Sequence, residues 1–336
     1  MTSAQAGSFR AFRVDKTEDR RFPRSVVARN DSELPDGELL IDVAYSSLNY
    51  KDALSATGNP GVTRNFPHTP GIDAAGTVVE SSAEGFAPGR EVVVIGFDLG
   101  MNTSGGFSQR IRVPAAWAVA MPDGLDARTS MILGTAGFTA ALCIDKLEQA
   151  GMGPEGGPVL VTGATGGVGS VAVKLLAKLG YEVHAGTGKA DRHDYLRDLG
   201  ASVVVSRDDL LAGAERPLGR ETWGGAVDTV GGQILVNAVK SLRYGASLAA
   251  CGLVASPEIP ASVFPFILRH VNLLGVDSVE LPVAGKARIW GKLAGPWQLD
   301  GLEELVEPLT LDTLSPAIDR ILAGKMVGRG LLDPNR

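Results

Sequence analysis

The sequence predicts an α/β protein in which a β-rich N-terminal part is followed by a doubly wound parallel sheet. A glycine-rich turn lies between a short apolar run, Val159–Val161, and an amphipathic stretch, 171–179. Residues 126 to about 275 alternate strand-like and helical runs, which is the pattern of a parallel sheet built from βαβ units. Residues 8–125 instead carry short strand-like runs between Pro, Gly and Asp, typical of a partly closed barrel.

Composition excludes several classes of partner and compartment. The net charge of −6 gives no reason to expect nucleic acid or an anionic membrane as a partner. Cys143 and Cys251, far apart in sequence, provide neither a cysteine-based zinc site nor a disulfide framework. No apolar run reaches the roughly 20 residues that span a bilayer, and the first ten residues lack the apolar core of a signal peptide. We expect a soluble cytoplasmic protein that acts on a small molecule.

The elements of the N-terminal part follow from alternating patterns and turn residues. A short helix is expected to open near Asn49, after the second strand, and Pro67–Asp73 reads as a rigid loop leading into the third. Strands are predicted over residues 9–14, 38–46, 75–80 and 90–95.

The second part begins with a long helical segment. Its helix is predicted from Arg128 to Ala150, with interruptions at Gly134 and Gly137. Later strands are predicted over 182–186, 203–205, 226–230 and 247–251, with helices over 171–179, 233–242, 287–293 and 315–323. Residues 303–310 fit either element, and 330–332 could form a final strand returning to the first domain.

The glycine turn has the context of a dinucleotide-binding motif. Gly166 and Gly169 fill the second and third places of G-x-G-x-x-G, and Ala164 stands in the first. The letters also fit the turn of short-chain dehydrogenases, but that turn opens its family's chains and needs a downstream Tyr-x-x-x-Lys that is missing here. The residues expected to hold a pyrophosphate at the helix start are Ala164, Thr165, Gly166, Gly167 and Val168.

The next strand indicates NADPH rather than NADH. An NAD site usually has Asp or Glu about 20 residues after the glycine turn, to bond the ribose. Here Thr187, Gly188 and Lys189 follow the strand, and Glu182 lies at its start. Lys189 and, after the following strand, Arg207 could bind a 2′-phosphate that a carboxylate would repel. Alternatively, Lys189 is a solvated lysine and Arg207 pairs with a neighbouring aspartate.

Several motifs together resemble one branch of the medium-chain dehydrogenase/reductase superfamily. They are similar to its zinc-independent quinone-oxidoreductase-like branch, and within it to the NADPH-dependent acryloyl-CoA reductases, over nearly the whole chain. The motifs are Ser46–Leu54, Pro70–Thr77, Gly134–Ala140, Val227–Gly231 and Pro265–Arg269. The resemblance implies a GroES-like catalytic domain over 1–125, completed by 297–336, and a Rossmann NADPH-binding domain over 126–296. It also implies a homodimer joined by edge strands of the nucleotide domains.

The resemblance implies no metal. Zinc-dependent members of the superfamily use Cys and His ligands beside a Gly-His-Glu segment. The comparable segment here is Gly71-Ile72-Asp73, without a histidine, and His68 alone does not make a site.

The implied reaction is NADPH-dependent reduction of the C=C bond of a 2-enoyl thioester, most simply acryloyl-CoA to propionyl-CoA. Quinone or enone reduction at the same site, and non-catalytic NADPH binding, remain alternatives. Tyr50 lies in the segment that the family places beside the nicotinamide. Its hydroxyl either donates to the thioester oxygen or merely walls the nicotinamide, while Asn49 and Asp52 fix the local backbone.

Other cofactor contacts are implied with less residue specificity. Cys251 reads as a packed thiol with no base placed for it, and Phe266 and Ile267 could equally belong to the core or a dimer contact. The expected contacts, besides Tyr50 and the phosphate-binding residues, are Ala53, Thr135, Thr139, Cys251, Leu253, Phe266, Ile267 and Ser278. Cations that could meet the CoA phosphates are Arg64, Lys286, Arg288, Lys325 and Arg329.

Overall fold

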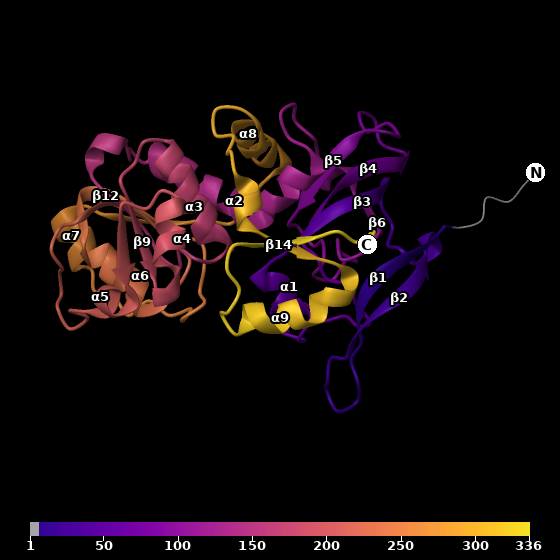
Figure 1. Ribbon diagram of the computed structural model, residues 1–336, viewed down its shortest axis with the longest axis horizontal. Coiled ribbons are helices and arrows are strands. Elements are labelled where there is room, and N and C mark those ends of the chain that lie inside the picture. Colours follow the sequence, from indigo (N-terminus) through magenta and orange to yellow (C-terminus); the bar gives the residue numbers. More distant parts are fainter. Residues whose placement is uncertain (1–6) are drawn as a thin grey trace, which may run out of the picture. The chain divides into compact units, whose positions relative to one another are not determined.

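The computed structural model describes residues 7–336 as two compact units (Figure 1). The expectation about a signal peptide rests on the first ten residues, of which 1–6 lie outside the described part. Unit 1 contains the chain up to Thr135 together with Val279–Gly295 and Gly301–Arg336, and unit 2 contains Ala136–Ser278 and Pro296–Asp300. This division differs from the expected boundaries in three places: residues 126–135 and 279–295 belong to unit 1, and residues 297–300 belong to unit 2.

Unit 1 is the β-rich part, as predicted. Two antiparallel strands form a small sheet, β1 (Ser8–Val14) and β2 (Arg24–Asn30). The larger sheet has the order β14-β15-β3-β4-β5-β7, with β6 paired to β3. Its strands are β3 (Leu39–Leu48), β4 (Asp73–Ser81), β5 (Glu91–Ile95), β6 (Arg110–Val113), β7 (Ala118–Ala120), β14 (Val306–Leu309) and β15 (Arg329–Leu332).

The predicted return of the C-terminus is confirmed. Strand β15 lies between β14 and β3 and pairs antiparallel with β3, where Gly330 faces Leu48. The ambiguous stretch before it becomes a short 3-10 segment followed by β14. Strands β2, β6 and β7 were not predicted.

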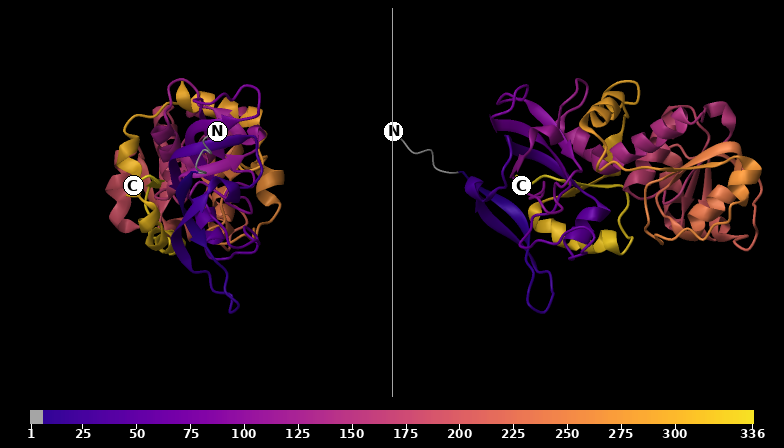
Figure 2. Two further views of the ribbon diagram at one scale, coloured as in Figure 1. Left: turned by 90° about the vertical axis from the view of Figure 1, so that its right-hand side faces the viewer. Right: turned by 180° about the vertical axis from the view of Figure 1, so that it is seen from behind.

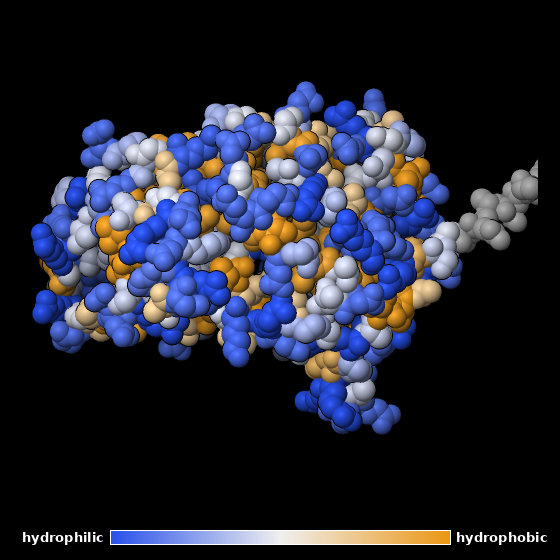
Figure 3. Space-filling model, viewed as in Figure 1, coloured by the Kyte–Doolittle hydropathy of each residue, from blue (hydrophilic) through white to orange (hydrophobic). Residues whose placement is uncertain are grey.

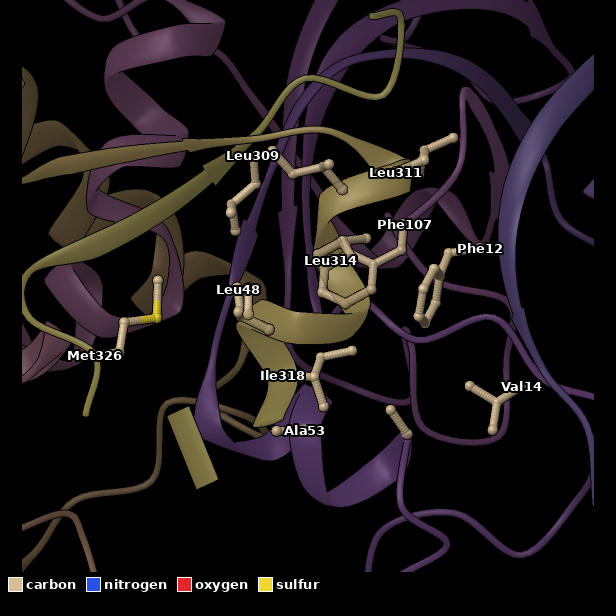
Figure 4. Packing of buried hydrophobic residues seen from close by; sticks show 13 residues of the cluster. Phe12, Val14, Leu48, Ala53, Phe107, Leu309, Leu311, Leu314, Ile318 and Met326 are labelled. Carbon is tan, nitrogen blue, oxygen red and sulfur yellow. The ribbon is translucent and has the colours of Figure 1, made fainter. Parts of the chain in front are cut away.

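Three helices complete unit 1: α1 (Tyr50–Ser55), α8 (Val283–Ala294) and α9 (Leu314–Leu322). Helices α1 and α9 lie side by side, and their apolar faces meet a core cluster that includes Leu48, Phe107 and Leu314. Figure 4 shows Ala53 of α1 close to Ile318 of α9 inside this cluster. The packing fixes α1 at one end of β3.

Unit 2 is the predicted doubly wound sheet. Its strands are parallel and have the order β10-β9-β8-β11-β12-β13. They are β8 (Val159–Val161), β9 (Val183–Thr187), β10 (Val203–Ser206), β11 (Trp223–Asp228), β12 (Leu242–Ala250) and β13 (Asn272–Gly275). The order of the strands reverses between β8 and β11, which is the position where such sheets bind ligands.

The helices of unit 2 connect these strands (Figures 1 and 2). They are α3 (Gly167–Lys178), α4 (His193–Asp198), α5 (Arg207–Leu211), α6 (Gly232–Lys240) and α7 (Phe264–Arg269). Helices α3 and α6 and every predicted strand of this part are confirmed within a few residues. Helices α4, α5 and α7 and strand β13 were not predicted.

Helix α2 (Ala127–Gln149) begins in unit 1 and continues into unit 2. Gly134 interrupts it with φ 51° and ψ −160°, as predicted, but Gly137 does not. By length and composition α2 could cross a membrane, contrary to the expectation from the sequence. However, 83% of its apolar window is buried in the protein, which is the behaviour of a core helix. Hydrophilic residues predominate on the faces visible in Figure 3.

Candidate functional site

The predicted nucleotide-binding residues gather at the carboxyl edge of the sheet in unit 2. Strands β8 and β9 end at Val161 and Thr187, β10 leads directly into Arg207, and β12 leads into Cys251. Because parallel strands share one carboxyl edge, these segments lie along one line although they are far apart in sequence.

The glycine turn after β8 is built as a backbone cradle. Gly163 has φ +60°, so the tight turn falls there rather than at Ala164, whose methyl group is fully buried. A Cβ at Gly169 would lie 2.3 Å from the Gly163 carbonyl oxygen, so the close approach of α3 to β8 requires glycine. Helix α3 starts at Gly167, with Gly166 as its N-cap.

The hydrogen bonds of the turn refine the predicted anion contacts. The N–H of Ala164 donates to Gly186 (3.0 Å), and that of Gly166 donates to Gly163 (2.9 Å). These two predicted donors are therefore already used inside the protein. The first-turn amides of α3, with Thr165 before them, have the orientation that a pyrophosphate needs.

The end of β9 is cationic. A Cβ on Gly188 would lie 2.4–2.6 Å from the Arg207 guanidinium, so Arg207 lies directly against this backbone. Thr187 is buried and accepts a hydrogen bond from the Lys189 N–H (3.1 Å). Burial lowers the pKa of Lys189, Arg192 lowers it further, and Asp191 opposes the change. This is an environment that gains from an added anion.

Two carboxylates near this site, Asp209 and Glu182, are engaged elsewhere. Asp209, a candidate partner of Arg207, accepts from the Ser206 hydroxyl (2.7 Å) at the start of α5. Glu182 lies 3.2 Å from His184 Nε2, at the beginning of β9. The site therefore fits the extra phosphate of NADPH better than a bare ribose hydroxyl.

The ends of β11 and β12 are held together by a buried aspartate. Asp228 accepts from the Thr162 hydroxyl (2.6 Å) and from the Gly231 N–H (2.8 Å), and burial raises its pKa. The Cys251 N–H donates to the Asp228 carbonyl (2.9 Å). Asp228 was predicted only as part of the motif Val227–Gly231, without this structural role.

Two other predicted cofactor residues meet in unit 2. The Thr139 hydroxyl donates to the Ser278 hydroxyl at 2.8 Å, and both side chains are buried. Leu253 remains 57% exposed beyond β12 and is free to contact a ligand. Phe266 instead packs against the apolar cluster under α6, so its role is in the core, and Ile267 is 68% exposed.

The two cysteines, distant in sequence, are neighbours in unit 2. A hydrogen bond between their thiols is the main cause of a raised pKa at Cys143, and burial adds to it. The Cys251 Sγ also donates to the Asp228 carbonyl (3.4 Å). These contacts support the interpretation of Cys251 as a packed thiol.

The segment around Tyr50 forms a compact corner of unit 1. Tyr50 is half-buried and is the first residue of α1, with Asn49 as the N-cap. The Asp52 carboxylate accepts from the Asn49 N–H and the Ile72 N–H, both at 2.8 Å. Burial, and then the charge of Asp73, raise the pKa of Asp52 to about 7. Asn49 and Asp52 therefore fix the backbone, as predicted.

Two residues of unit 1 that are predicted as cofactor contacts have structural roles. Ala53 is fully buried in the core between α1 and α9, so its side chain is not available to a cofactor. Thr135 uses its N–H (2.9 Å) and its hydroxyl (2.5 Å) to bind the Asp73 carboxylate.

Arg329 and Lys286, which are predicted to meet the CoA phosphates, do not fit that role because their side chains are buried. Arg329 is 2% exposed and donates to the Ile132 carbonyl (2.8 Å). Lys286 is fully buried and donates to the Ile95 carbonyl (2.6 Å), with its Nζ 3.3 Å from the centroid of the Phe97 ring. Arg64 and Lys325 are exposed and remain candidates.

The segment comparable to the zinc-binding one carries no histidine ligand. Ile72 is a core residue, and His68 is buried with its Nε2 2.8 Å from the Gly100 carbonyl. Burial lowers the pKa of His68. Within residues 7–336, no three His, Cys, Asp or Glu side chains are grouped so that they could hold a metal ion.

Comparison with known proteins gives two family matches. Residues 35–123 match the alcohol dehydrogenase GroES-like domain, and residues 167–284 match the zinc-binding dehydrogenase family. The chain is 47% identical over 328 residues to the acrylyl-CoA reductase AcuI of Ruegeria pomeroyi, covering 97% of this chain and 99% of the relative.

Two solved structures show the same fold. The yhdH oxidoreductase of Salmonella enterica, in complex with NADP, has a TM-score of 0.93 and 44% identity, covering 96% of this chain and 99% of that one. The Bacillus subtilis protein yhfP with NAD bound has a TM-score of 0.94 and 42% identity, covering 97% and 99%. Among curated proteins, the latter is provisionally named quinone oxidoreductase YhfP; 322 aligned residues are 44% identical and cover 96% of this chain and 97% of the relative.

Proposed function

The chain belongs to the medium-chain dehydrogenase/reductase superfamily, and from this premise we propose that it is an NADPH-dependent 2-enoyl-CoA reductase. The substrate proposed first is acryloyl-CoA, reduced to propionyl-CoA without a metal. The relative from Ruegeria pomeroyi supports this substrate. Superfamily membership alone does not choose between thioesters and quinones, since fold does not imply function.

The observation that carries the choice of cofactor is the cationic end of β9. Arg207 lies against Gly188, Lys189 is half-buried beside it, and no acidic side chain follows the strand before Asp191. A guanidinium beside a phosphate forms charge-assisted hydrogen bonds, which are roughly twice as strong as neutral ones. We assign the first-turn amides of α3 to the pyrophosphate, and Thr187, Lys189 and Arg207 to the 2′-phosphate.

The protein supplies binding and electrostatic stabilisation, while NADPH, when bound, supplies the hydride for the substrate β-carbon. Hydride addition at the β-carbon would leave negative charge on the thioester oxygen, and a proton must then reach the α-carbon to complete the reduction. The Tyr50 hydroxyl is proposed to donate a hydrogen bond to that oxygen, from a rigid position at the start of α1. Asp52 holds the backbone of this segment and does not itself contact the substrate.

Quinone reduction is the second candidate, favoured by the 44% identity to the Bacillus subtilis relative. Parallel assays separate the two: NADPH oxidation with acryloyl-CoA, crotonyl-CoA and a series of quinones, with propionyl-CoA identified by mass spectrometry. We expect turnover with acryloyl-CoA to exceed that with quinones. Turnover with quinones alone would support the second candidate. Bound NADPH with no acceptor reduced would indicate a non-catalytic role.

We also propose that the protein is a cytoplasmic homodimer. Strand β13 is the end strand of the sheet in unit 2. Exposed apolar side chains gather in the segment that precedes it: Leu253, Val254, Ile259, Val263, Ile267 and Leu268. An open strand edge beside apolar side chains favours pairing with a second copy of the chain.

A further inference from the structure

A buried polar cluster at the base of α1 has no function assigned so far. Arg329 of β15 and Asp73 of β4 are linked by two parallel bridges. Ser47 accepts from Arg329 Nη2 (2.9 Å) and donates to Asp73 Oδ2. The Asn49 side chain accepts from Arg329 Nη1 (3.3 Å) and donates to Asp73 Oδ2 (2.7 Å).

The cluster lies in a dry part of unit 1. Asp73 and Ser47 are fully buried, Arg329 is 2% exposed, and Asn49 is 7% exposed. Burying a charged pair seldom adds net stability, because desolvation offsets the attraction. Its established benefit in other proteins is a single fixed arrangement of the groups around it.

The group it fixes is the start of α1. Asn49 immediately precedes Tyr50, and its main chain is held by Asp52 while its side chain is held by Asp73 and Arg329. Helix α1 has six residues, too few to be stable in isolation. The direction of Tyr50 therefore depends on these anchors.

The surrounding backbone packs closely against the cluster. A Cβ at Gly134 would lie 2.3 Å from the Ser47 hydroxyl and 2.6 Å from both Arg329 Nη2 and Asp73 Oδ2. Thr135 closes the other side by binding both oxygens of Asp73. The two partners of the Asn49 side chain, Asp73 and Arg329, are thus themselves held in place.

We propose that Asn49, held by Asp73 and Arg329, is the positioning residue that aims the Tyr50 hydroxyl at the substrate. This rests on the function proposed above only in its last step, the role of the hydroxyl. The placement of the Tyr50 ring by Asn49 is a separate statement and can be tested without a substrate.

The test uses the full-length protein labelled with 3-fluorotyrosine. The chain has five tyrosines, and the Tyr50 resonance is assigned by its loss in Tyr50→Phe. Asn49→Ala should shift or broaden this resonance, both with and without NADPH. Ser46→Ala is the matched control, because the Ser46 hydroxyl donates to the Asp73 carbonyl (2.7 Å) and has no hydrogen bond to α1. An unmoved Tyr50 resonance in Asn49→Ala would overturn the proposal.

Kinetics then test the last step. Asn49→Ala should lower kcat by about 10- to 100-fold, the range expected when a reacting group is misplaced. The Kd for NADPH should stay unchanged, and Ser46→Ala should keep full turnover. In the double variant with Tyr50→Phe, the Asn49→Ala substitution should lower kcat no further than Tyr50→Phe alone. Additive losses would overturn positioning through Tyr50.

A second variant keeps the test decisive if Asn49→Ala folds poorly. Arg329→Lys keeps the charge but cannot donate to Ser47, Asn49 and the Ile132 carbonyl together, so a smaller effect of the same direction is expected. An unmoved Tyr50 resonance in this variant also contradicts the proposal. If Tyr50→Phe itself leaves turnover intact, the proposed mechanism fails, while the fluorine spectra still decide the placement.

Discussion

Arg207 is the residue on which the preference between the two nicotinamide cofactors depends most directly. Its guanidinium lies against Gly188 at the end of β9. We expect Arg207→Ala to weaken NADPH binding by about 1.5–3 kcal/mol, the range for a charge-assisted hydrogen bond, because the 2′-phosphate loses its planar donor. Affinity for NADH should change little. Fluorescence titration with both cofactors measures this, and equal losses for the two would contradict the assignment.

The raised pKa of Asp52 predicts how the stability of the protein depends on pH. Its pKa is about 7 in the folded protein against 3.8 in the unfolded chain, so between these values the folded state holds a proton that the unfolded state has lost. This contribution to stability is complete below the lower value and disappears as pH rises through the upper one. Wild-type protein should therefore lose thermal stability as pH rises from about 4 to about 7, relative to Asp52→Asn, and should change little above that range. Melting curves of both proteins, recorded across this pH range, check this. The same dependence of Tm on pH in wild-type protein and in Asp52→Asn would contradict it.

At the residue scale, the chemical type of a site residue is easier to predict from the sequence than the burial of its side chain. Thr187 and Lys189 could be assigned because their distance from the glycine turn is set by one strand and one helix. Ala53, Arg329 and Lys286 were misassigned, because an arginine in a tail looks the same in a sequence whether it faces water or a buried aspartate. Only the pairing of β15 with β3 shows that Arg329 lies inside unit 1.

At the scale of elements, the interruption of α2 is the feature most sensitive to substitution. Gly134 has φ 51° with ψ −160°, and a Cβ added there would overlap the buried polar cluster. Gly134→Ala should lower the free energy of unfolding by about 2–4 kcal/mol, from backbone strain and overpacking together.

The matched control for this substitution is Gly291→Ala in α8, where a Cβ would meet nothing within 4 Å. There the stability should rise by up to about 1 kcal/mol, from helix propensity alone. Chemical denaturation of the two variants makes the comparison. Equal effects would show that the interruption has no special role.

The predicted and missed elements differ in how they are held. Strands such as β8 and β9 are apolar runs that any parallel sheet would bury, so their pattern alone identifies them. Strands β6 and β7 have four and three residues, and α4, α5 and α7 have six or fewer. Such segments are ordered by neighbours distant in sequence. Length alone does not decide this, because β8 has three residues, whereas the missed β2 has seven, none of them buried.

At the scale of the whole molecule, the apolar segment before β13 makes a prediction about assembly. Ile267→Asp should convert a dimer into a monomer, because a buried charge without a partner costs several kcal/mol at an interface. Leu211→Asp is the control: Leu211 is also partly exposed, but it lies on α5, next to the other end strand of the sheet. Light scattering after size exclusion measures both, and an unchanged mass for Ile267→Asp would contradict the proposed interface.

The two-part division was predicted, but its boundaries were not. The family resemblance placed the nucleotide domain up to residue 296. In the structure, α8 belongs to unit 1, whose Ile95 carbonyl is bound by Lys286. A change of unit without a change of pattern leaves no signal in the sequence.

The position of β15 has a consequence for how the protein is made. Unit 1 needs residues 329–332 between β14 and β3, whereas nearly all of unit 2 is one continuous segment, Ala136–Ser278. During synthesis on the ribosome, the sheet of unit 2 can therefore form before strand β15 of unit 1 has been translated. Unit 1, although its first strands are translated first, is completed last.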